Sequence, residues 1–251
     1  MAHEFSPEEL SRYSRHLSLP GFGRDAQQRL ADSSVLIIGA GGLGSPVALY
    51  LAASGVGHIT IADGDNVDLS NLQRQIIHAT ADLGRPKAIS AAEKMMALNP
   101  EIRVTPLTRF ISEDEIEPLI LTHDFIIDAT DSPEGKFMID AACARCGKAY
   151  SHGAIFQYEG HTMTILPSTA RLTDLFPEGP VLSDRPQPVG PLGVVPGILG
   201  TIQATEAIKY LTGVGELLTD RLLRFDILTM QFSTIRLRRT PHITYPPSGN
   251  L

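Results

Sequence analysis

The stretch Ser34-Val-Leu-Ile-Ile-Gly-Ala-Gly-Gly-Leu-Gly44 decides the fold. Residues 34–38 form an apolar run of strand length, and the glycine-rich turn 39–44 leads into a helix expected from about residue 45 to 54. Glycines in this context let the backbone approach a phosphate at a helix N-terminus, where free N–H groups favour an anion. The stretch therefore predicts a strand–turn–helix unit that binds a nucleotide phosphate.

The chain after this unit alternates between strand and helix. We expect further strands at residues 58–62, 102–106 and 124–128, and helices at residues 86–98 and 134–146. Strands that alternate with helices require right-handed crossovers and pair in parallel. The pattern predicts the α/β class, with a Rossmann-like, doubly wound, mostly parallel sheet.

The two ends of the chain differ from this central pattern. Residues 1–32 are expected to form short helices, the first of them capped by Ser6. After residue 148 we expect strands at 149–156, 161–166, 222–226 and 232–237, a helix at about 196–211, and a Pro-rich loop at 167–191. These strands should extend the same sheet as antiparallel C-terminal strands. Residues 1–251 are thus predicted to form one domain, with N-terminal helices (1–32), a nucleotide-binding half (33–148) and a second half (149–251).

Composition limits the classes of function. The chain has 251 residues, 43% of them hydrophobic, and a formal net charge of -7, which argues against a nucleic-acid partner. No apolar run follows the polar N-terminus, and the longest apolar stretch, residues 192–199, is too short to span a membrane. With two cysteines and no secretion signal, the chain is expected to be cytoplasmic and to lack a disulfide framework.

Polar side chains follow the glycine turn along the sequence. Asp63 ends the second strand 24 residues after Gly39, where a carboxylate can bind a ribose hydroxyl. Asn71, Arg74 and Lys87 then place an amide and two cations on the side of the sheet where ligands bind. Two cations suit a triphosphate whose α-phosphorus is attacked while charge builds on the departing pyrophosphate.

A carboxylate just beyond the fourth strand completes the predicted nucleotide site. Asp131 lies next to the point where the strand order should reverse, and there it can hold Mg²⁺ on the phosphates. We therefore predict that a nucleoside triphosphate and Mg²⁺ bind here. An oxidoreductase that binds NAD through the same glycine turn is an alternative, but it gives residues 70–75 and Lys87 no role.

Five segments point together to one family. They are Gly39-Ala-Gly-Gly-Leu-Gly44, Ser70-Asn-Leu-Gln-Arg-Gln75, Pro86-Lys87, Asp128-Ala-Thr-Asp131 and Gly193-Val-Val-Pro-Gly-Ile-Leu-Gly-Thr-Ile-Gln-Ala-Thr-Glu-Ala-Ile-Lys209. From about residue 10 to 239 the chain resembles the MoeB/ThiF (HesA/MoeB/ThiF) adenylyltransferases, relatives of the ubiquitin-activating enzymes. The second and fifth segments are far more specific than the glycine motif alone. The resemblance implies a ThiF-type domain whose second half, with the loop 167–191 crossing over it, binds a carrier protein.

The resemblance implies a role for each matching residue. Gly39, Gly41, Gly42 and Gly44 line the phosphates, Asp63 binds the ribose, Asn71, Arg74 and Lys87 contact the triphosphate, and Asp131 supports Mg²⁺ and catalysis. Arg15 matches an arginine that family members lend across a dimer interface to the partner's ATP. The implied catalytic residues are Asp131, Arg74, Lys87 and Arg15, and the implied assembly is a homodimer.

The family's substrate is a ubiquitin-like sulfur-carrier protein with a C-terminal Gly-Gly. The implied reaction is attack of the terminal carboxylate on the ATP α-phosphate, which gives the carrier acyl-adenylate and pyrophosphate. The carboxylate is already a nucleophile, so alignment and charge stabilisation can do most of the work.

The sequence departs from the family pattern at its cysteines. Many relatives hold a structural zinc with two Cys-x-x-Cys pairs, but here Arg171 and Asp174 occupy the first pair's places and residues 241–246 contain no cysteine. Zinc is therefore not expected, and Arg171 and Asp174 could pair across one helical turn as a weak substitute. Residues 183–190 also lack the cysteine that some relatives use to carry sulfur, so a separate sulfur donor is expected.

The remaining departures are smaller. Cys143 and Cys146 have the spacing of a redox motif without its context, and we interpret them as buried or half-buried structural thiols. Ser132 replaces a usual asparagine, and Lys136 stands where an arginine is common. The sequence leaves open two other functions: a non-catalytic relative that binds a carrier, and adenylation of another carboxylate, such as a peptide C-terminus.

Overall fold

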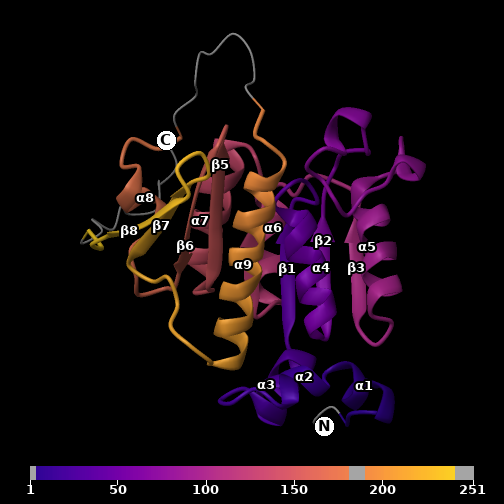
Figure 1. The fold of residues 1–251 in the computed structure, drawn as a ribbon. Helices are drawn as coiled ribbons and strands as arrows, with labels where there is room; N and C mark the ends of the chain where they lie inside the picture. Colours follow the sequence, from indigo (N-terminus) through magenta and orange to yellow (C-terminus); the bar gives the residue numbers. More distant parts are fainter. Residues whose placement is uncertain (1–3, 181–189, 241–251) are drawn as a thin grey trace.

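An eight-stranded sheet runs through the chain in the computed structural model, which describes residues 4–180 and 190–240 (Figure 1). The strand order is β3-β2-β1-β4-β5-β6-β7-β8. The strands are β1 (Ser34–Ile38), β2 (His58–Ala62), β3 (Arg103–Leu107), β4 (Phe125–Asp128), β5 (Tyr150–Phe156), β6 (Glu159–Ile165), β7 (Arg221–Asp226) and β8 (Gln231–Arg236). From β3 to β5 neighbouring strands pair in parallel, and from β5 to β8 they pair antiparallel. The predicted fold class is confirmed.

Helices cover both faces of this sheet. They are α1 (Pro7–Arg12), α2 (Ser14–Leu17), α3 (Gly23–Asp32), α4 (Gly44–Ser54), α5 (Lys87–Leu98), α6 (Glu113–Leu121), α7 (Pro133–Cys146), α8 (Leu172–Leu175) and α9 (Val194–Thr212). In Figure 1, α4, α5 and α9 lie in front of the sheet, α6 and α7 lie behind it, and α1–α3 lie beyond the amino ends of β1 and β2. None of the helices in the described ranges is long and apolar enough to cross a bilayer.

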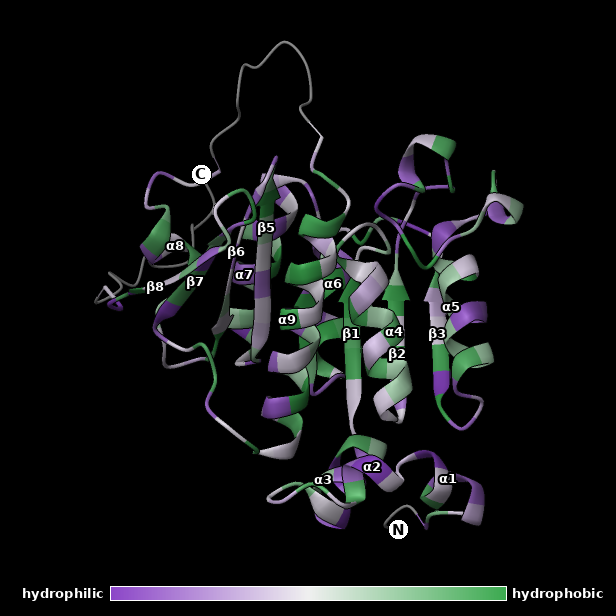
Figure 2. Ribbon diagram, in the orientation of Figure 1, coloured by the Kyte–Doolittle hydropathy of each residue, from purple (hydrophilic) through white to green (hydrophobic). Residues whose placement is uncertain are grey.

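The core forms on both faces of the central strands because apolar residues occupy most positions of these strands, on both faces. In β1, Val35 and Ile37 pack with the α4 and α9 side, whereas Leu36 and Ile38 pack with the α6 and α7 side. Figure 2 shows hydrophobic residues concentrated on the central strands and hydrophilic ones on α1–α3. Burial of each large aliphatic side chain contributes about 1.5–3 kcal/mol to the stability of the fold. This packing holds the strands in place and so positions the loops at their carboxyl ends.

Two helical segments differ from the sequence prediction. Helix α6, which the pattern did not reveal, carries a proline at position 118, and its start is marked by Ser112, whose backbone N–H and hydroxyl bond to the Glu115 carboxylate. Near the N-terminus, the single helix expected from Ser6 is divided at Tyr13 into α1 and α2. The proline inside α6 and the break at Tyr13 are local features, and hydrophobic periodicity does not encode them.

Helix α9 is pressed against the glycine turn, and glycines permit that contact. A Cβ at Gly200 would lie 2.4 Å from the carbonyl oxygen of Leu43, and one at Gly193 would lie 2.0 Å from that of Gln73. A Cβ at Gly42 would lie 3.0 Å from Cβ of Pro196, in the first turn of α9. The two most specific sequence segments, residues 70–75 and 193–209, therefore meet at the turn.

Part of the predicted crossing loop and the tail cannot be compared with the structure. Residues 181–189 and 241–251 lie outside the described residues. They include most of residues 183–190, where some relatives carry a cysteine, and residues 241–246, where the second pair of zinc ligands would lie. The described part of the loop contains α8, and the described chain resumes at Gly190.

Candidate functional site

A cavity of about 650 Å³ opens at the carboxyl ends of the parallel strands. Its wall includes Gly39, Gly41, Gly42, Asp63, Arg74, Lys87 and Asp131, which are all residues of the predicted nucleotide site. It continues past β4 to residues of β5, β6 and α8. Ligands of doubly wound sheets bind at this edge, where the strand order reverses between β1 and β4.

The glycine turn is shaped by the segment that follows β4. Gly39 has φ +107°, and a Cβ there would lie 2.4 Å from the carbonyl oxygen of Ala129, so only glycine fits without strain. Gly44 does not line the cavity. A Cβ at Gly44 would lie 1.9 Å from the carbonyl oxygen of Gly39, so only glycine allows this close approach behind the turn. Its role in the structure is to let α4 start close to β1.

Two side chains hold the turn from either side. The Asp63 carboxylate accepts hydrogen bonds from the backbone N–H groups of Ala40 and Asp65, both at 2.8 Å. His78 lies 2.9 Å from the Ala40 carbonyl oxygen through Nε2 and 2.9 Å from the Ser90 hydroxyl through Nδ1. Burial lowers the pKa of His78, so its neutral ring donates through Nε2 to that carbonyl. Sequence reasoning missed His78, although it follows residues 70–75 closely.

The two predicted cations, Arg74 and Lys87, line the same cavity. Nζ of Lys87, at the start of α5, forms a 2.8 Å ion pair with Oδ2 of Asp65. The Lys87 side chain is 7% exposed, but that of Asp65 is 55% exposed. The Arg74 guanidinium donates to the carbonyl oxygen of Ser70 at 3.1 Å. Both cations reach the cavity, and an incoming anion can compete with Asp65 for Lys87.

Asn71 and Arg15 are not part of this cavity wall. The Asn71 side chain closes a short turn, with Oδ1 accepting from the N–H of Asp68 at 3.3 Å. Arg15 is exposed on α2, at the opposite end of the strands from the cavity (Figure 1). Arg15 is therefore remote from the cavity of its own chain.

Two carboxylates in the segment after β4 have different surroundings. Asp131 is exposed at the cavity, and within the described chain it has no hydrogen bond or ion pair. Asp128 is fully buried and lies 3.2 Å from Nζ of Lys136 through each of its oxygens. Burial alone would raise the pKa of Asp128, but Lys136 and the hydrogen bond from His152 outweigh it and lower the pKa to about 2.

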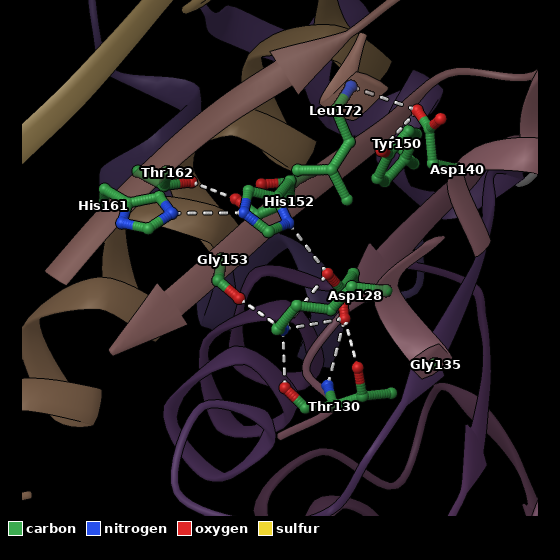
Figure 3. A network of polar contacts seen from close by, with 12 residues as sticks. Asp128, Thr130, Gly135, Asp140, Tyr150, His152, Gly153, His161, Thr162 and Leu172 are labelled. Carbon is green, nitrogen blue, oxygen red and sulfur yellow. Dashed lines mark hydrogen bonds and ion pairs between the residues drawn. The ribbon is translucent and has the colours of Figure 1, made fainter. Parts of the chain in front are cut away.

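A polar chain continues from Asp128 across β5 to β6 (Figure 3). His152 Nδ1 lies 3.0 Å from Oδ2 of Asp128, and His152 Nε2 lies 3.4 Å from Nε2 of His161. Nζ of Lys136 also donates to the carbonyl oxygens of Thr130 and Gly153, each at 2.6 Å. His152, His161 and Lys136 all line the cavity. Sequence reasoning noted Lys136 only as a replaced arginine and missed both histidines.

The side chains at the lost zinc positions have other partners. The Arg171 guanidinium bonds to Oδ2 of Asp140 on α7 at 2.8 Å, and the Asp174 carboxylate accepts from the backbone N–H groups of Arg171 and Thr240. The expected Arg171–Asp174 side-chain pairing is thus replaced by a link between α8 and α7, because the buried Asp140 offers a partner shielded from water.

The two cysteines are free, as buried and half-buried thiols, which confirms their predicted placement. Burial raises the pKa of both thiols, and that of Cys143 most strongly. A thiol held in the protonated form is a poor nucleophile.

Known proteins are similar to this chain in sequence or in fold. Probable adenylyltransferase/sulfurtransferase MoeZ of Mycobacterium tuberculosis is 42% identical over 247 residues, which cover 96% of this chain and 63% of MoeZ. The sulfur carrier protein adenylyltransferase of Thermus thermophilus is 37% identical over 246 residues, 94% of this chain and 90% of that protein. The crystal structure of E. coli MccB has a TM-score of 0.84 at 20% identity, covering 98% of this chain and 75% of MccB. This likeness to MccB concerns the fold.

The ThiF family profile matches residues 13–245, which include the glycine turn, Arg74, Lys87, Asp131 and helix α9. With this match and relatives about 40% identical over nearly its full length, the chain belongs to the ThiF family.

Proposed function

We propose that this protein uses ATP to adenylate the C-terminal glycine carboxylate of a ubiquitin-like sulfur-carrier protein. The observation that carries the proposal is the cavity wall, where the glycine turn, Asp63, two cations and the unpaired Asp131 share one space. The names of two relatives, which specify adenylyltransferases and, for one, a sulfur carrier protein, support the substrate class. Residues 149–251 would bind the carrier.

ATP fits the polar end of the cavity. Asp63 ends β2 beside the turn, where a ribose hydroxyl can bond to its carboxylate. The phosphates would lie against the turn, within reach of Arg74 and Lys87. The two cations favour a triphosphate over NAD, because the departing pyrophosphate carries more negative charge than the bridging phosphates of NAD.

The reaction needs no covalent bond to the enzyme. A carboxylate oxygen attacks the α-phosphorus, and the bond from that phosphorus to the oxygen bridging to the β-phosphate breaks. Pyrophosphate leaves with the electron pair, and the acyl group remains bonded to AMP. Arg74 and Lys87 stabilise the charge that builds on the leaving group, a contribution of about 3–4 kcal/mol for one well-placed donor.

The cavity fits a magnesium ion shared with ATP better than one held by protein alone. No group of three or more His, Cys, Asp or Glu side chains within residues 4–180 and 190–240 is arranged to hold a metal. Magnesium often binds through one or two carboxylates together with substrate phosphates, and Asp131 is an available carboxylate. Bound there, Mg²⁺ would offset the charge of the phosphates.

A homodimer accounts for the position of Arg15. The residue is exposed and remote from its own cavity, so it can contact ATP only in a partner subunit. An Arg15→Ala protein mixed with a Lys87→Ala protein would form heterodimers with one intact site, which restores about a quarter of the wild-type sites. No recovery despite subunit exchange, measured by mass spectrometry of intact dimers, would mean that Arg15 does not act in trans.

A separate protein would supply the sulfur. Cys143 is 1% exposed and its thiol is held protonated by burial, so it is unsuited to carry sulfur to an adenylate. Replacing Cys143 with alanine and Cys146 with serine should leave carrier adenylation intact, and metal analysis should find no stoichiometric zinc. One zinc per chain would contradict this part of the proposal.

Carrier-dependent exchange of labelled pyrophosphate into ATP tests the function. Asp131→Ala and Arg74→Ala should each reduce exchange by about 100-fold or more, whereas Asp114→Ala, on the exposed first turn of α6, should not. Carrier binding without exchange would favour a non-catalytic relative. Unchanged exchange in Asp131→Ala would remove Asp131 from the mechanism.

A further inference from the structure

The cavity has an end that the nucleotide does not explain. Beyond Asp131 its wall is formed by His152, Ile155, His161 and Phe176. If ATP lies against the glycine turn, an acyl group beside the α-phosphate must extend its chain toward this other end. A chain ending in glycines brings peptide N–H groups, and these need acceptors when they leave water.

The tautomer of His152 is fixed by its neighbours. Asp128 is ionised and fully buried, and one of its oxygens faces His152 Nδ1 at 3.0 Å (Figure 3). Burial lowers the pKa of His152, so its ring is neutral and carries a single proton. A carboxylate only accepts, so that proton is on Nδ1, and Nε2 of His152 presents a lone pair.

The tautomer of His161 follows from that lone pair. Nε2 of His161 lies 3.4 Å from Nε2 of His152, and two facing lone pairs would repel, so His161 Nε2–H donates. Burial, with a smaller contribution from His152, lowers the pKa of His161 to about 3, so this ring is also neutral. Nδ1 of His161 is consequently an acceptor, and within the described chain it has no hydrogen-bond partner.

The surroundings of His161 make this acceptor distinctive. On the cavity side its ring lies 6.4 Å, centroid to centroid, from the ring of Phe176, and Ile155 and Leu172 also line this end. Lys136 is already bonded to Asp128 and to two carbonyl oxygens, and Arg224, opposite His161 on β7, pairs with Glu159. An apolar wall with one acceptor suits an extended peptide segment, which can hydrogen-bond through a backbone N–H while its other atoms pack.

We propose that His161 is a positioning residue for the acyl substrate, whose tail donates a peptide N–H to Nδ1 of His161. Asp128 and His152 act through this atom, because they fix the His161 proton on Nε2. The inference rests on the proposed function and adds to it a contact that selects a peptide-like acyl chain over a small carboxylic acid.

Two substitutions at His161 separate its two nitrogen atoms. In His161→Asn the side-chain oxygen reaches the place of Nδ1, so the acceptor is kept and the bond to His152 is lost. In His161→Gln the amide nitrogen reaches the place of Nε2, so the bond to His152 is kept and the acceptor is lost. A purely structural role, in which His161 only supports His152, predicts that His161→Gln is the milder change.

The test is pyrophosphate exchange with a Gly-Gly carrier, with KM measured separately for carrier and ATP. We expect His161→Gln to raise the carrier KM about tenfold and His161→Asn to raise it less than about threefold. The KM for ATP should be unchanged in both, which also shows that each variant is folded.

Four results would overturn the inference. The reverse order of the two variants would indicate the structural role. Equal loss in both, together with one tightly bound transition-metal ion per wild-type chain, would assign the facing Nε2 atoms to a metal. If the wild-type protein catalyses exchange and both variants keep its KM for the carrier, the His161 contact alone is refuted. Absence of exchange in the wild-type protein would overturn the proposed function and the inference with it.

Discussion

Two lysines line the same cavity, and the aspartates with which they pair differ in their surroundings. Lys87 pairs with Asp65, whose side chain is 55% exposed, and Lys136 pairs with Asp128, whose side chain is fully buried. Both lysine side chains are close to buried, at 7% and 11% exposed. An exposed carboxylate is readily solvated when its partner leaves, but a buried one is not. The comparison indicates that Lys87 can exchange Asp65 for a phosphate, while Lys136 is a permanent part of the scaffold.

The largest expected effect is on stability, from removal of Lys136. Lys136→Met leaves the Asp128 carboxylate buried without its cation, which should lower the free energy of unfolding by about 3–5 kcal/mol. Urea unfolding at neutral pH measures the loss. As a control, Arg145→Ala breaks the exposed pair with Glu117 (57% and 41% exposed) and should cost at most about 1 kcal/mol. Equal losses in the two variants would contradict the comparison.

Removal of Lys87 should have its main effect on activity. In the proposed reaction Lys87 stabilises the leaving pyrophosphate, so Lys87→Ala should reduce exchange by about 100- to 1,000-fold. The free energy of unfolding should fall by about 1 kcal/mol, since Asp65 regains water. Steady-state exchange and urea unfolding on one preparation make the comparison. A loss of stability as large as in Lys136→Met would show that the Lys87 pair is also structural.

The pH dependence of stability should report His161. Its pKa is lowered to about 3 in the folded protein by burial, so between that value and about 6.5 the unfolded chain binds more protons. Stability contributed by the neutral ring is therefore complete above about pH 6.5 and decreases as the pH falls toward 3. His161→Asn should flatten the decrease of the unfolding free energy over this range. An unchanged slope would show that His161 titrates normally in the folded state.

The smallest expected effect comes from the exposed aspartate. Asp65→Asn removes the charge that phosphate must displace from Lys87, so the KM for ATP should fall by a factor of about two to five. The unfolding free energy should change by less than about 1 kcal/mol. A large rise in the KM for ATP would mean that Asp65 positions Lys87 for binding instead of competing for it.

Local pattern was sufficient to predict which residues line the end of the cavity at the glycine turn. The run Ser34–Ile38 and the turn that follows it specify their own geometry. Asp63 directly follows β2 and Asp131 comes shortly after β4, while Arg74 and Lys87 lie between β2 and the body of α5. The fold class could be predicted for the same reason, because alternating strands and helices allow few topologies.

The other end of the cavity depends on strand register, which the sequence does not reveal. His152 pairs opposite Met163 and His161 opposite Ala154, so the two histidines lie diagonally on one face of β5 and β6. A shift of one residue would move either ring to the other face. The sequence assigned no role to Asp128, and its burial beside Lys136 makes it part of the scaffold.

The central claim is that the cavity adenylates a carboxyl terminus, and mass spectrometry of the carrier tests it most directly. The protein, Mg²⁺-ATP and a Gly-Gly carrier are mixed, with the same carrier amidated at its C-terminus as the control. The account predicts one adenylyl group on the last glycine of the free-acid carrier and none on the amidated carrier. Adenylylation of both carriers, or of neither while ATP is bound, would contradict it.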